Sequence, residues 1–488
     1  MAFLERNANR GSIPTGFNID NSLKLERGNS EKLSRTPSSA GNLRTWTYSF
    51  WLKRTQLGIN SYHLEAKGSG DRFFILGFNE NDQILFYDIY SDDYGKAFTR
   101  RFRDTSAWYH IVLRADTTNG TAGNRMRLYV NGVQETAVTS DYGDFPQNHD
   151  TQINKTVVHN IGYRTDINQY ASGYMAETCL IDGTSLGPDS FGEFDEDSGI
   201  WKPIDVSGLT FGTNGFYQEY KSSSALGADT VPGGNSIDYT TSNIAAADQA
   251  TDTPTNNFAT SNFLISQGGY FVTTEGGTKC VLGTSGPGNN TGGVSALSTI
   301  AVSKGKWYME MKNDVANDSV DTYARFGFVD VGTLENGGVD GKVIARPGSA
   351  GGAYFGGTGG GRYHYNNTAQ GNSTTWIRQV MGMALDLDNR KAYFHIEGTY
   401  TNSGDPANGT DNGGQYDMNT GGDGIYVDET WVLGASAYNL GIFLMNWGGF
   451  TTMPISSAAT DANGYGTFEY APPSGYYALC SKNVAKYG

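Results

Sequence analysis

The sequence predicts an all-β protein: two β-sandwich domains in series, with an extended N-terminal arm and a linker. Glycine accounts for 66 of 488 residues and aromatic residues for 13% of the chain. Aromatic side chains favour strands and glycine favours tight turns, so this combination is typical of all-β proteins. Apolar residues also alternate in short runs, and helical periodicity is not sustained over ten residues. At about 150 residues per domain, the length allows two or three domains.

The charge balance narrows the choice of partner. Fifty acidic residues against 35 basic ones give a net charge of -15 at pH 7. Such a chain repels phosphate backbones and anionic lipids, so we expect no nucleic acid partner. No apolar run approaches the roughly 18 residues of a membrane span, so we expect no membrane insertion. The N-terminus carries Glu5, Arg6 and Arg10 where a secretory leader needs apolar residues.

The three cysteines bear on the compartment in which the protein is made. Cys179, Cys280 and Cys480 lie far apart, without a CxxC pair and without histidines at zinc-ligand spacing. This pattern supports neither a disulfide framework nor a structural zinc site. We therefore expect synthesis in a reducing cytoplasm.

The first half of the chain divides into an arm and a domain. Residues 1–20 show no periodicity, which predicts an extended arm ordered by a partner surface or a frayed terminus. Residues 21–220 form the first predicted domain. Its clearest strand, 46–53, places Trp46, Tyr48, Phe50 and Leu52 on one face and mostly polar residues on the other. Further strands are predicted at 83–90, 108–115 and 127–130, the last followed by the hairpin signal Asn131-Gly132.

The second half begins after a polar, turn-rich stretch. Residues 221–262 contain serine, glycine and proline clusters and predict a linker. Residues 263–488 form the second predicted domain. Its strands are predicted at 304–311, 325–329, 381–389, 391–396, 431–433 and 442–444. The glycine-rich stretches 356–372 and 403–424 predict disordered tips or binding loops.

Several motifs of the first domain resemble those of the concanavalin A-like and laminin-G-like jelly-roll family. They are the strand 46–53, the sequence WYHIV at 108–112, LYVNG at 128–132, and IGY at 161–163 followed by GYMAETCLID at 173–182. The resemblance covers residues 21–185. It implies a jelly-roll sandwich.

The second domain resembles a SPRY domain. Lys306–Met311 matches the early strand of that family, and GMALDLDNRKAYFHIEG at 382–398 matches its hairpin. The segment 252–260 is similar to one that joins these two modules in large marine-phage proteins described as tail fibres. The pairing implies a virion component that touches the host surface. The long helical or collagen-like shaft of a full-length fibre is missing from this sequence.

Catalytic signatures are weak. Jelly-roll glycosidases carry Glu-x-Asp-x-x-Glu, and the nearest match, Glu193-Phe-Asp195-Glu-Asp-Ser198, ends in serine where the acid is required. It is expected in a turn, as a solvated acidic loop. No G-x-S-x-G elbow stands between a strand and a helix. The sequence therefore predicts a protein that is not an enzyme.

Aromatic and acidic side chains in loops are the candidates for ligand binding. Sugar rings stack on aromatic faces while carboxylates and amides bind the hydroxyls. The ligand-binding candidates are Tyr90, Asp92, Asp93, Tyr94, Tyr363, Tyr365 and Trp376. No cofactor is required, although clustered oxygen donors suit a Ca²⁺ ion. The metal candidates are Asp405, Asn408 and Asp411, with Asn412 beside them, and a second acidic cluster comprises Asp82, Asp88, Asp92 and Asp93.

These observations and the resemblance lead to one functional hypothesis with two alternatives. The leading hypothesis is a non-enzymatic phage tail fibre or fibre-like adhesin, made in the host cytoplasm and incorporated in the virion. Its arm would dock on other virion proteins, and its loops would bind a host-surface glycan or protein. Weak binding sites favour a homo-oligomer, such as a trimer, because several sites that bind together raise the overall affinity. The alternatives are a structural virion component, as a capsid decoration or tail connector protein, and a glycan depolymerase.

Overall fold

The structure is a computed structural model of the 488-residue chain and confirms the all-β class. It describes residues 16–89, 93–234, 237–262, 270–283, 294–314, 324–331, 351–356, 362–365, 368–370, 378–410, 416–417, 430–437 and 441–488. The chain forms two compact units, which we call the N-terminal unit, residues 14–255, and the C-terminal unit, from residue 256 to 488.

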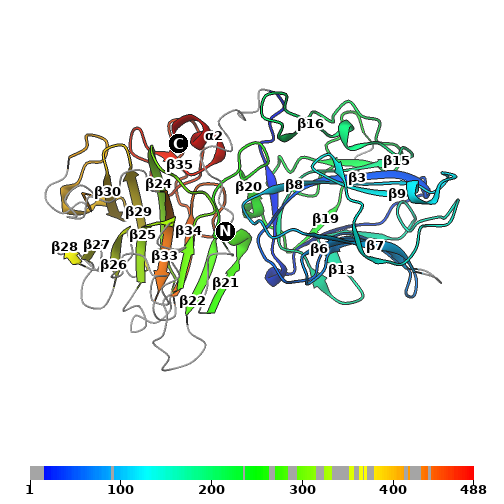
Figure 1. Cartoon of the computed structure of the whole chain (residues 1–488), viewed down its shortest axis with the longest axis horizontal. Helices are drawn as coiled ribbons and strands as arrows, with labels where there is room; N and C mark the ends of the chain where they lie inside the picture. Colours follow the sequence, from blue (N-terminus) through cyan, green and yellow to red (C-terminus); the bar gives the residue numbers. More distant parts are fainter. Residues whose placement is uncertain are drawn as a thin grey trace. The chain divides into compact units, whose positions relative to one another are not determined.

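Two eight-stranded sheets form the N-terminal unit, and Figure 1 shows them as stacked layers. We call them sheet A and sheet B. Sheet A has the order β10 (Val133–Gln134), β9 (Met126–Val130), β8 (Trp108–Asp116), β3 (Thr45–Arg54), β15 (Gly173–Asp182), β1 (Ser22–Leu25) and β20 (Gln249–Ala250), with β18 (Phe216–Gln218) also paired to β15. Sheet B has the order β11 (Val138–Asp141), β7 (Asp93–Arg101), β6 (Gln83–Ile89), β5 (Phe73–Phe78), β4 (Ser61–Lys67), β12 (Val158–Ile161), β2 (Lys32–Arg35) and β19 (Thr240–Ser242).

Short elements complete this unit. The two-stranded ribbons are β13 (Tyr163–Arg164) with β14 (Gln169–Tyr170), and β16 (Gly192–Phe194) with β17 (Trp201–Pro203). Single-turn 3-10 helices are η2 (Arg27–Asn29), η3 (Ala122–Asn124), η4 (Pro188–Ser190) and η5 (Ala246–Asp248). The predicted hairpin at Asn131-Gly132 is confirmed between β9 and β10, with positive φ angles of 49° and 78° at the two turn residues.

The predicted inward face of β3 is confirmed. Trp46, Tyr48, Phe50 and Leu52 are fully buried in the cluster between the sheets. Trp46 meets Phe74 of the facing sheet edge-on, with ring centroids 5.3 Å apart. Alternation therefore predicted the correct face, because only one side of each strand can enter the core of a sandwich.

The opposite face of β3 is also buried, which the alternation did not predict. Ser49 and Lys53 are 1% and 0% exposed. A second apolar layer, built from Phe191, Val206, Phe211 and Tyr217, packs on this side of sheet A. Another part of the same face holds His110, which stacks on Trp51 and accepts a hydrogen bond from Trp201 Nε1 at 3.0 Å.

The predicted linker is wrong for residues 221–255, because they belong to the N-terminal unit. Leu226 and Tyr239 join its core, β19 pairs with β2, and β20 pairs with β1. Residues 256–262 belong to the C-terminal unit, where Phe258 forms an isolated bridge with Cys480. Turn-forming composition does not distinguish a linker from a segment that folds back over a sheet.

Two buried ion pairs hold the last part of this segment on sheet A. Lys53 Nζ lies 2.7 Å from Asp252 Oδ2, with both side chains at most 1% exposed. Trp108 Nε1 donates to the other oxygen of Asp252 at 3.0 Å. Lys24 Nζ lies 2.7 Å from Asp248 Oδ1. Each lysine is buried against a carboxylate of the segment, which is the condition under which a buried charge is tolerated.

Part of the predicted arm is also ordered on its own unit. Ile19 is 3% exposed, its N–H donates to Thr255 Oγ1 at 3.0 Å, and its carbonyl accepts from the same hydroxyl at 2.9 Å. Ile19 is therefore held by its own unit, and docking of the arm on a partner surface stays a prediction. Residues 1–15 lie outside the described residues.

The C-terminal unit contains a nine-stranded and a six-stranded sheet. The nine-stranded sheet has the order β21 (Tyr270–Thr274), β22 (Lys279–Gly283), β34 (Gly441–Asn446), β24 (Lys306–Asn313), β29 (Val380–Asp386), β30 (Lys391–Ile396) and β31 (Thr399–Tyr400), with β32 (Tyr416–Asp417) paired to β30 and β35 (Tyr477–Ala478) to β24. The six-stranded sheet has the order β23 (Val294–Leu297), β33 (Trp431–Ala437), β25 (Ala324–Asp330), β26 (Gly351–Gly356), β27 (Arg362–Tyr365) and β28 (Thr368–Gln370). The helices are η6 (Glu275–Gly277), η7 (Thr401–Ser403) and α2 (Ser481–Tyr487).

The predicted hairpin at 381–396 is confirmed as β29 and β30. Asp386 accepts hydrogen bonds from both the backbone N–H and the side-chain amide of Asn389, each at 2.9 Å. Arg390 adopts a positive φ of 56° to complete the turn. The strands of this unit enclose a core that includes Trp307, Phe326 and Trp431.

We expect Asp252→Ala to lower the free energy of unfolding of the N-terminal unit by about 3–5 kcal/mol, because it leaves Lys53 buried without its carboxylate. Urea denaturation measures the change. The matched control is Asp150→Ala, whose partner Arg44 is 42% exposed; a loss below about 1 kcal/mol is expected there. Equal losses in the two variants would contradict the role given to the buried pair.

Candidate functional site

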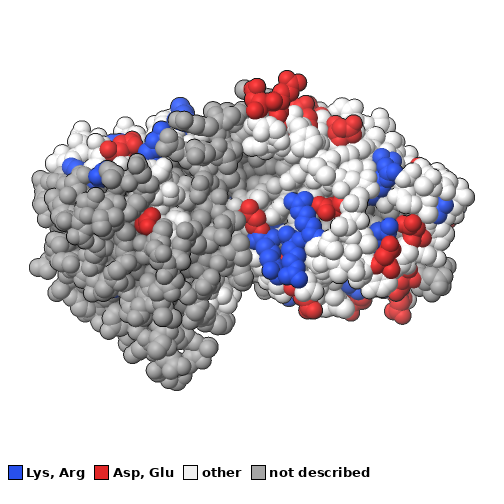
Figure 2. Space-filling model, in the orientation of Figure 1, with Lys and Arg blue, Asp and Glu red and all other residues white. Residues whose placement is uncertain are grey.

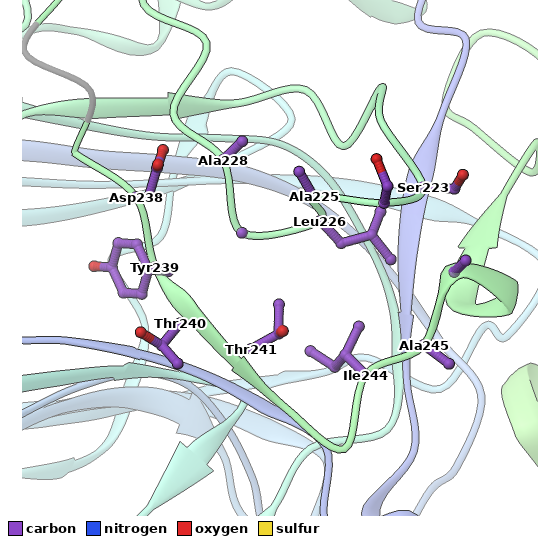
Figure 3. Close-up of a pocket in the computed structure, with 13 residues that line it drawn as sticks. Ser223, Ala225, Leu226, Ala228, Asp238, Tyr239, Thr240, Thr241, Ile244 and Ala245 are labelled. Carbon is purple, nitrogen blue, oxygen red and sulfur yellow. The ribbon is translucent and has the colours of Figure 1, made fainter.

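Two adjoining clefts open beside β19 in the N-terminal unit. The first, which we call the Tyr239 cleft, has a volume of about 390 Å³. Figure 3 shows its two walls, a loop carrying Ser223 to Ala228 and the strand segment carrying Asp238 to Ala245. The cleft is lined by Ser223, Ser224, Ala225, Leu226, Gly227, Ala228, Asp238, Tyr239, Thr240, Thr241, Ile244, Ala245 and Ala246.

Local turn chemistry builds the upper wall of the Tyr239 cleft. Two successive turns close through hydrogen bonds from the N–H of Ala225 to Ser222 and from the N–H of Ala228 to Ala225. The carbonyl of Gly227 then accepts from the N–H of Tyr239 at 2.8 Å. A Cβ atom on Gly227 would lie 2.0 Å from the Tyr239 carbonyl, so this close approach requires glycine.

The second cleft, which we call the Arg35 cleft, has a volume of about 410 Å³. Asp238 lines both clefts, so they adjoin at that residue. The Arg35 cleft is lined by Arg35, Thr36, Pro37, Ser38, Ser39, Thr213, Asn214, Ile237 and Asp238. Both volumes fall in the range of about 300–1,000 Å³ that is usual for small-molecule sites.

Arg35 is held in place by aromatic rings. Its guanidinium carbon lies 5.8 Å from the centroid of Phe216 and 5.5 Å from that of Tyr239. Nη2 makes a long contact of 3.5 Å with Asn214 Oδ1, and the buried Nη1 has no hydrogen-bond partner. Cation–π contacts therefore position a guanidinium that keeps hydrogen-bonding capacity.

The charges around the Arg35 cleft favour a neutral ligand. Burial lowers the pKa of Arg35 from its ordinary value, and Tyr239, Asp229 and Asp182 oppose this shift. Asp238 adds an exposed carboxylate at the rim. Since negative groups outnumber the single guanidinium, an anion gains little here, whereas hydroxyl groups can use both the donors and the acceptors.

The Tyr239 cleft was not predicted because its residues lie in the stretch assigned to the linker, and the Arg35 cleft was not predicted because it joins residues of three separate segments. Asp238 and Thr240 alternate with the buried Tyr239, so a short period-two pattern was present. Three residues are too few for that signal to be distinguished from chance.

Of the predicted ligand-binding residues in the first unit, the structure describes Asp93 and Tyr94. Asp93 is exposed at the start of β7. Tyr94 is half-buried and packs on Phe145 and His149, with centroid distances of 5.8 and 5.4 Å, and its role in binding stays a prediction. Tyr90 and Asp92 lie outside the described residues.

In the second unit, Tyr363 and Tyr365 lie on β27, which pairs with β26 and β28. The glycine-rich stretch 356–372 therefore contains two strands and is not wholly a loop. Trp376 lies outside the described residues. A role of these residues in binding stays a prediction.

Two of the predicted metal ligands of the second unit, Asp405 and Asn408, form a local turn. Asp405 accepts hydrogen bonds from the backbone N–H of Asn408 at 3.1 Å and from its side-chain amide at 2.6 Å. Asp411 and Asn412 lie outside the described residues. The part of the chain that the structure describes contains no group of three or more histidine, cysteine, aspartate or glutamate side chains able to hold a metal. Calcium binding stays a prediction.

Of the second predicted acidic cluster, the structure describes Asp82, Asp88 and Asp93. Asp82 pairs with Arg54 at 3.1 Å and with Arg103 at 2.9 Å. Asp88 is buried near His149, with the two side chains 3.4 Å apart, and burial raises its pKa. Asp82 and Asp88 therefore contact different side chains, and calcium binding by this cluster stays a prediction.

The glycosidase-like acidic stretch lies on the surface. Glu193 lies on β16 rather than in a turn, and the turn begins at Asp195. Asp195 accepts hydrogen bonds from the N–H and hydroxyl of Ser198, each at 2.9 Å, and from Lys202. These bonds lower the pKa of Asp195 to about 2. Figure 2 shows acidic side chains gathered over β16, in agreement with the prediction of a solvated acidic surface.

Glu310 and Glu177 are buried carboxylates whose pKa values are raised. Glu310 accepts hydrogen bonds from Tyr308 Oη, Asn446 Nδ2 and the N–H groups of Glu469 and Tyr470, and burial raises its pKa to about 7. Glu177 accepts from Tyr217 Oη, and burial raises its pKa to about 8. Glu177 also has a positive φ of 48° at a bulge of β15. Neither glutamate lines a cleft described above.

The comparison with protein families finds one match. A family described as the concanavalin A-like lectin/glucanases superfamily matches residues 27–184, which lie within the N-terminal unit. This agrees with the predicted jelly-roll resemblance for that part of the chain. A comparison with curated proteins finds no match. No helix among the described residues is long and apolar enough to cross a membrane.

Solved structures show weak likenesses. A carbohydrate-binding protein from Bacteroides ovatus, described as putative, has a TM-score of 0.32 and 15% identity, over 46% of this chain and 58% of its own. A pentraxin from Limulus polyphemus has a TM-score of 0.26 and 15% identity, over 35% and 80%. The TRIM65 PSpry domain has a TM-score of 0.27 and 13% identity, over 39% and 92%. Scores this low carry no functional assignment, and the SPRY resemblance of the second unit stays a prediction.

The buried glutamate at the bulge predicts a pH dependence. The pKa of Glu177 is raised from 4.5 to about 8, so its contribution to stability is fully present below 4.5 and is lost as the pH rises through 8. As the pH rises from 6 to 9, we expect the stability of the Glu177→Gln protein to fall less than that of the wild type. Melting temperatures across this range measure the effect. Glu193→Gln, whose side chain is 57% exposed, should follow the wild type.

Proposed function

We propose that this protein is a non-enzymatic adhesin that binds a neutral glycan in the adjoining Tyr239 and Arg35 clefts. The observation that carries the proposal is the lining of these clefts. It combines serine and threonine hydroxyls, an amide, one carboxylate and one guanidinium around a shared residue, Asp238. Sugar hydroxyls act as donors and acceptors at once, so a mixed neutral lining suits them. The family match to lectins and glucanases supports a carbohydrate ligand.

The proposed setting is the virion of a phage, as a tail fibre or fibre-like protein that binds a host-surface glycan or protein. The support is the sequence resemblance of the two modules and their pairing. In this proposal the N-terminal segment docks on other virion proteins. Assembly as a homo-oligomer, such as a trimer, raises the overall affinity of weak binding sites. A negative net charge of -15 suits a particle that stays soluble outside a cell.

Two alternatives are distinguished by experiment. A structural virion component, such as a capsid decoration or tail connector protein, would have both units covered by neighbouring subunits. A density map of the intact particle separates this alternative from the adhesin. A depolymerase would release reducing ends when the purified protein is incubated with host polysaccharide. Sustained release would contradict the non-enzymatic assignment.

Substitution of the residue shared by both clefts tests the binding site. We expect Asp238→Ala to weaken glycan binding at least tenfold, because it removes the carboxylate acceptor common to the two clefts. Glycan arrays identify the ligand, and titration calorimetry measures the affinity. Asp150→Ala is the control, since its side chain is 50% exposed and Asp150 lines neither cleft. Unchanged binding in Asp238→Ala would reject these clefts as the site.

Filling the Tyr239 cleft tests the site without removing a charge. Ala225 is exposed on the loop wall, so Ala225→Trp should occupy the cleft without entering the core. We expect binding to fall while the melting temperature stays near that of the wild type. Full binding by a folded Ala225→Trp protein would place the glycan elsewhere.

A further inference from the structure

A buried lysine meets two buried carboxylates where the first and last strands of the N-terminal unit pair. Lys24 lies on β1, and Asp248 ends η5 immediately before β20, the partner of β1. Lys24 Nζ is 2.7 Å from Asp248 Oδ1 and 2.9 Å from Glu31 Oε1. The three side chains are 1%, 10% and 1% exposed. We call them the Lys24 triad.

We propose that the Lys24 triad is a modification site, at which Lys24 Nζ and Asp248 Cγ form an intramolecular amide bond. Amide formation from an amine and a carboxylic acid releases one water molecule and requires no oxidant or cofactor. In water the reaction is unfavourable and slow, but exclusion of water and fixed proximity of the two groups favour it.

The reaction moves the protons of the Lys24 ammonium group one after another. One proton of the ammonium passes to Asp248 Oδ1, which leaves a neutral amine beside a neutral carboxylic acid. The Nζ lone pair then attacks Cγ, and Glu31 takes a second proton from Nζ. Glu31 returns this proton to the leaving Oδ1, the Cγ–Oδ1 bond breaks, and water departs. The third proton remains on the amide nitrogen.

The surroundings of Asp248 and Glu31 suit these roles. The other oxygen of Asp248, Oδ2, accepts the backbone N–H of Ala245 at 2.7 Å, a donor placed to stabilise charge on that oxygen during attack. Glu31 is fixed by the N–H of Glu26 at 2.7 Å and the side-chain amide of Asn29 at 2.8 Å. Burial raises the pKa of Glu31, which suits a group that accepts and returns a proton.

The charge state of Lys24 sets the slow step. Burial alone would lower its pKa, but Glu31 and Asp248 outweigh this effect and raise the pKa above its ordinary value. The resting triad therefore holds an ion pair, and the reaction begins with proton transfer within it. A second buried pair, Lys53 with Asp252, serves as an internal comparison.

The proposed bond would close the N-terminal unit covalently. It would join β1 to the segment that carries Asp238 and β19, and so fix one wall of each cleft. A cross-link between distant positions also removes conformations of the unfolded chain. A protein that transmits force between a particle and a cell surface would gain resistance to mechanical opening.

Intact-mass spectrometry of the folded, full-length protein tests the proposal. We expect a mass lower than that of the chain by one water molecule, and a proteolytic peptide in which Lys24 and Asp248 are joined. Lys24→Arg and Glu31→Gln should show the full mass. In Asp248→Asn the same bond displaces the amide nitrogen, so this variant should lose ammonia in place of water.

The full mass in wild-type protein after prolonged incubation would overturn the proposal. A water loss that persists in Lys24→Arg, or a cross-link mapped to Lys53 and Asp252, would overturn it as well. The peptide map is made on the wild type, so the test stands even if a variant fails to fold. It does not depend on glycan binding, so its failure would leave the proposed function untouched.

Discussion

Two buried lysines constrain the architecture of the N-terminal unit. Lys24 and Lys53 lie on the face of sheet A that points away from the core, on either side of Tyr174 in the register of β1, β15 and β3. An ammonium group in such a place is tolerated only with a carboxylate beside it. The segment 245–252 supplies both carboxylates, Asp248 and Asp252. The chain must therefore return across this sheet before it leaves the unit.

That return creates the candidate site. The same stretch of chain provides β19, which extends sheet B at its edge beside β2. Arg35 at the end of β2 and Asp238 just before β19 are brought to one place in this way. The clefts are thus a consequence of how the last segment is anchored, and their polar lining reflects the edge of a sheet rather than its apolar interior.

Sequence periodicity identified strands well where one face of a strand enters a core. Trp46 to Leu52 alternated as expected, and the turns at Asn131-Gly132 and Asp386–Arg390 carried clear turn chemistry. The burial of the outward residues was not predicted, because Ser49 contacts His110 and Lys53 pairs with Asp252, and both partners come from other parts of the chain. The binding residues predicted from loop aromatics stay predictions. Tyr94 is half-buried against the core, since an aromatic ring at a strand end can both pack and bind.

Local alternation and short motifs were enough to predict the all-β class, most strands and the resemblance of residues 21–185 to the jelly-roll family. The folded chain was needed to show that residues 221–255 belong to the first unit, that Arg35 meets Asp238 in a cleft, and that Lys24 meets Asp248 and Glu31. Lys24 and Asp248 are separated by more than two hundred residues, and their pairing depends on the register of β1 with β20. Long-range register leaves no local pattern in a single sequence, since many pairings satisfy the same alternation.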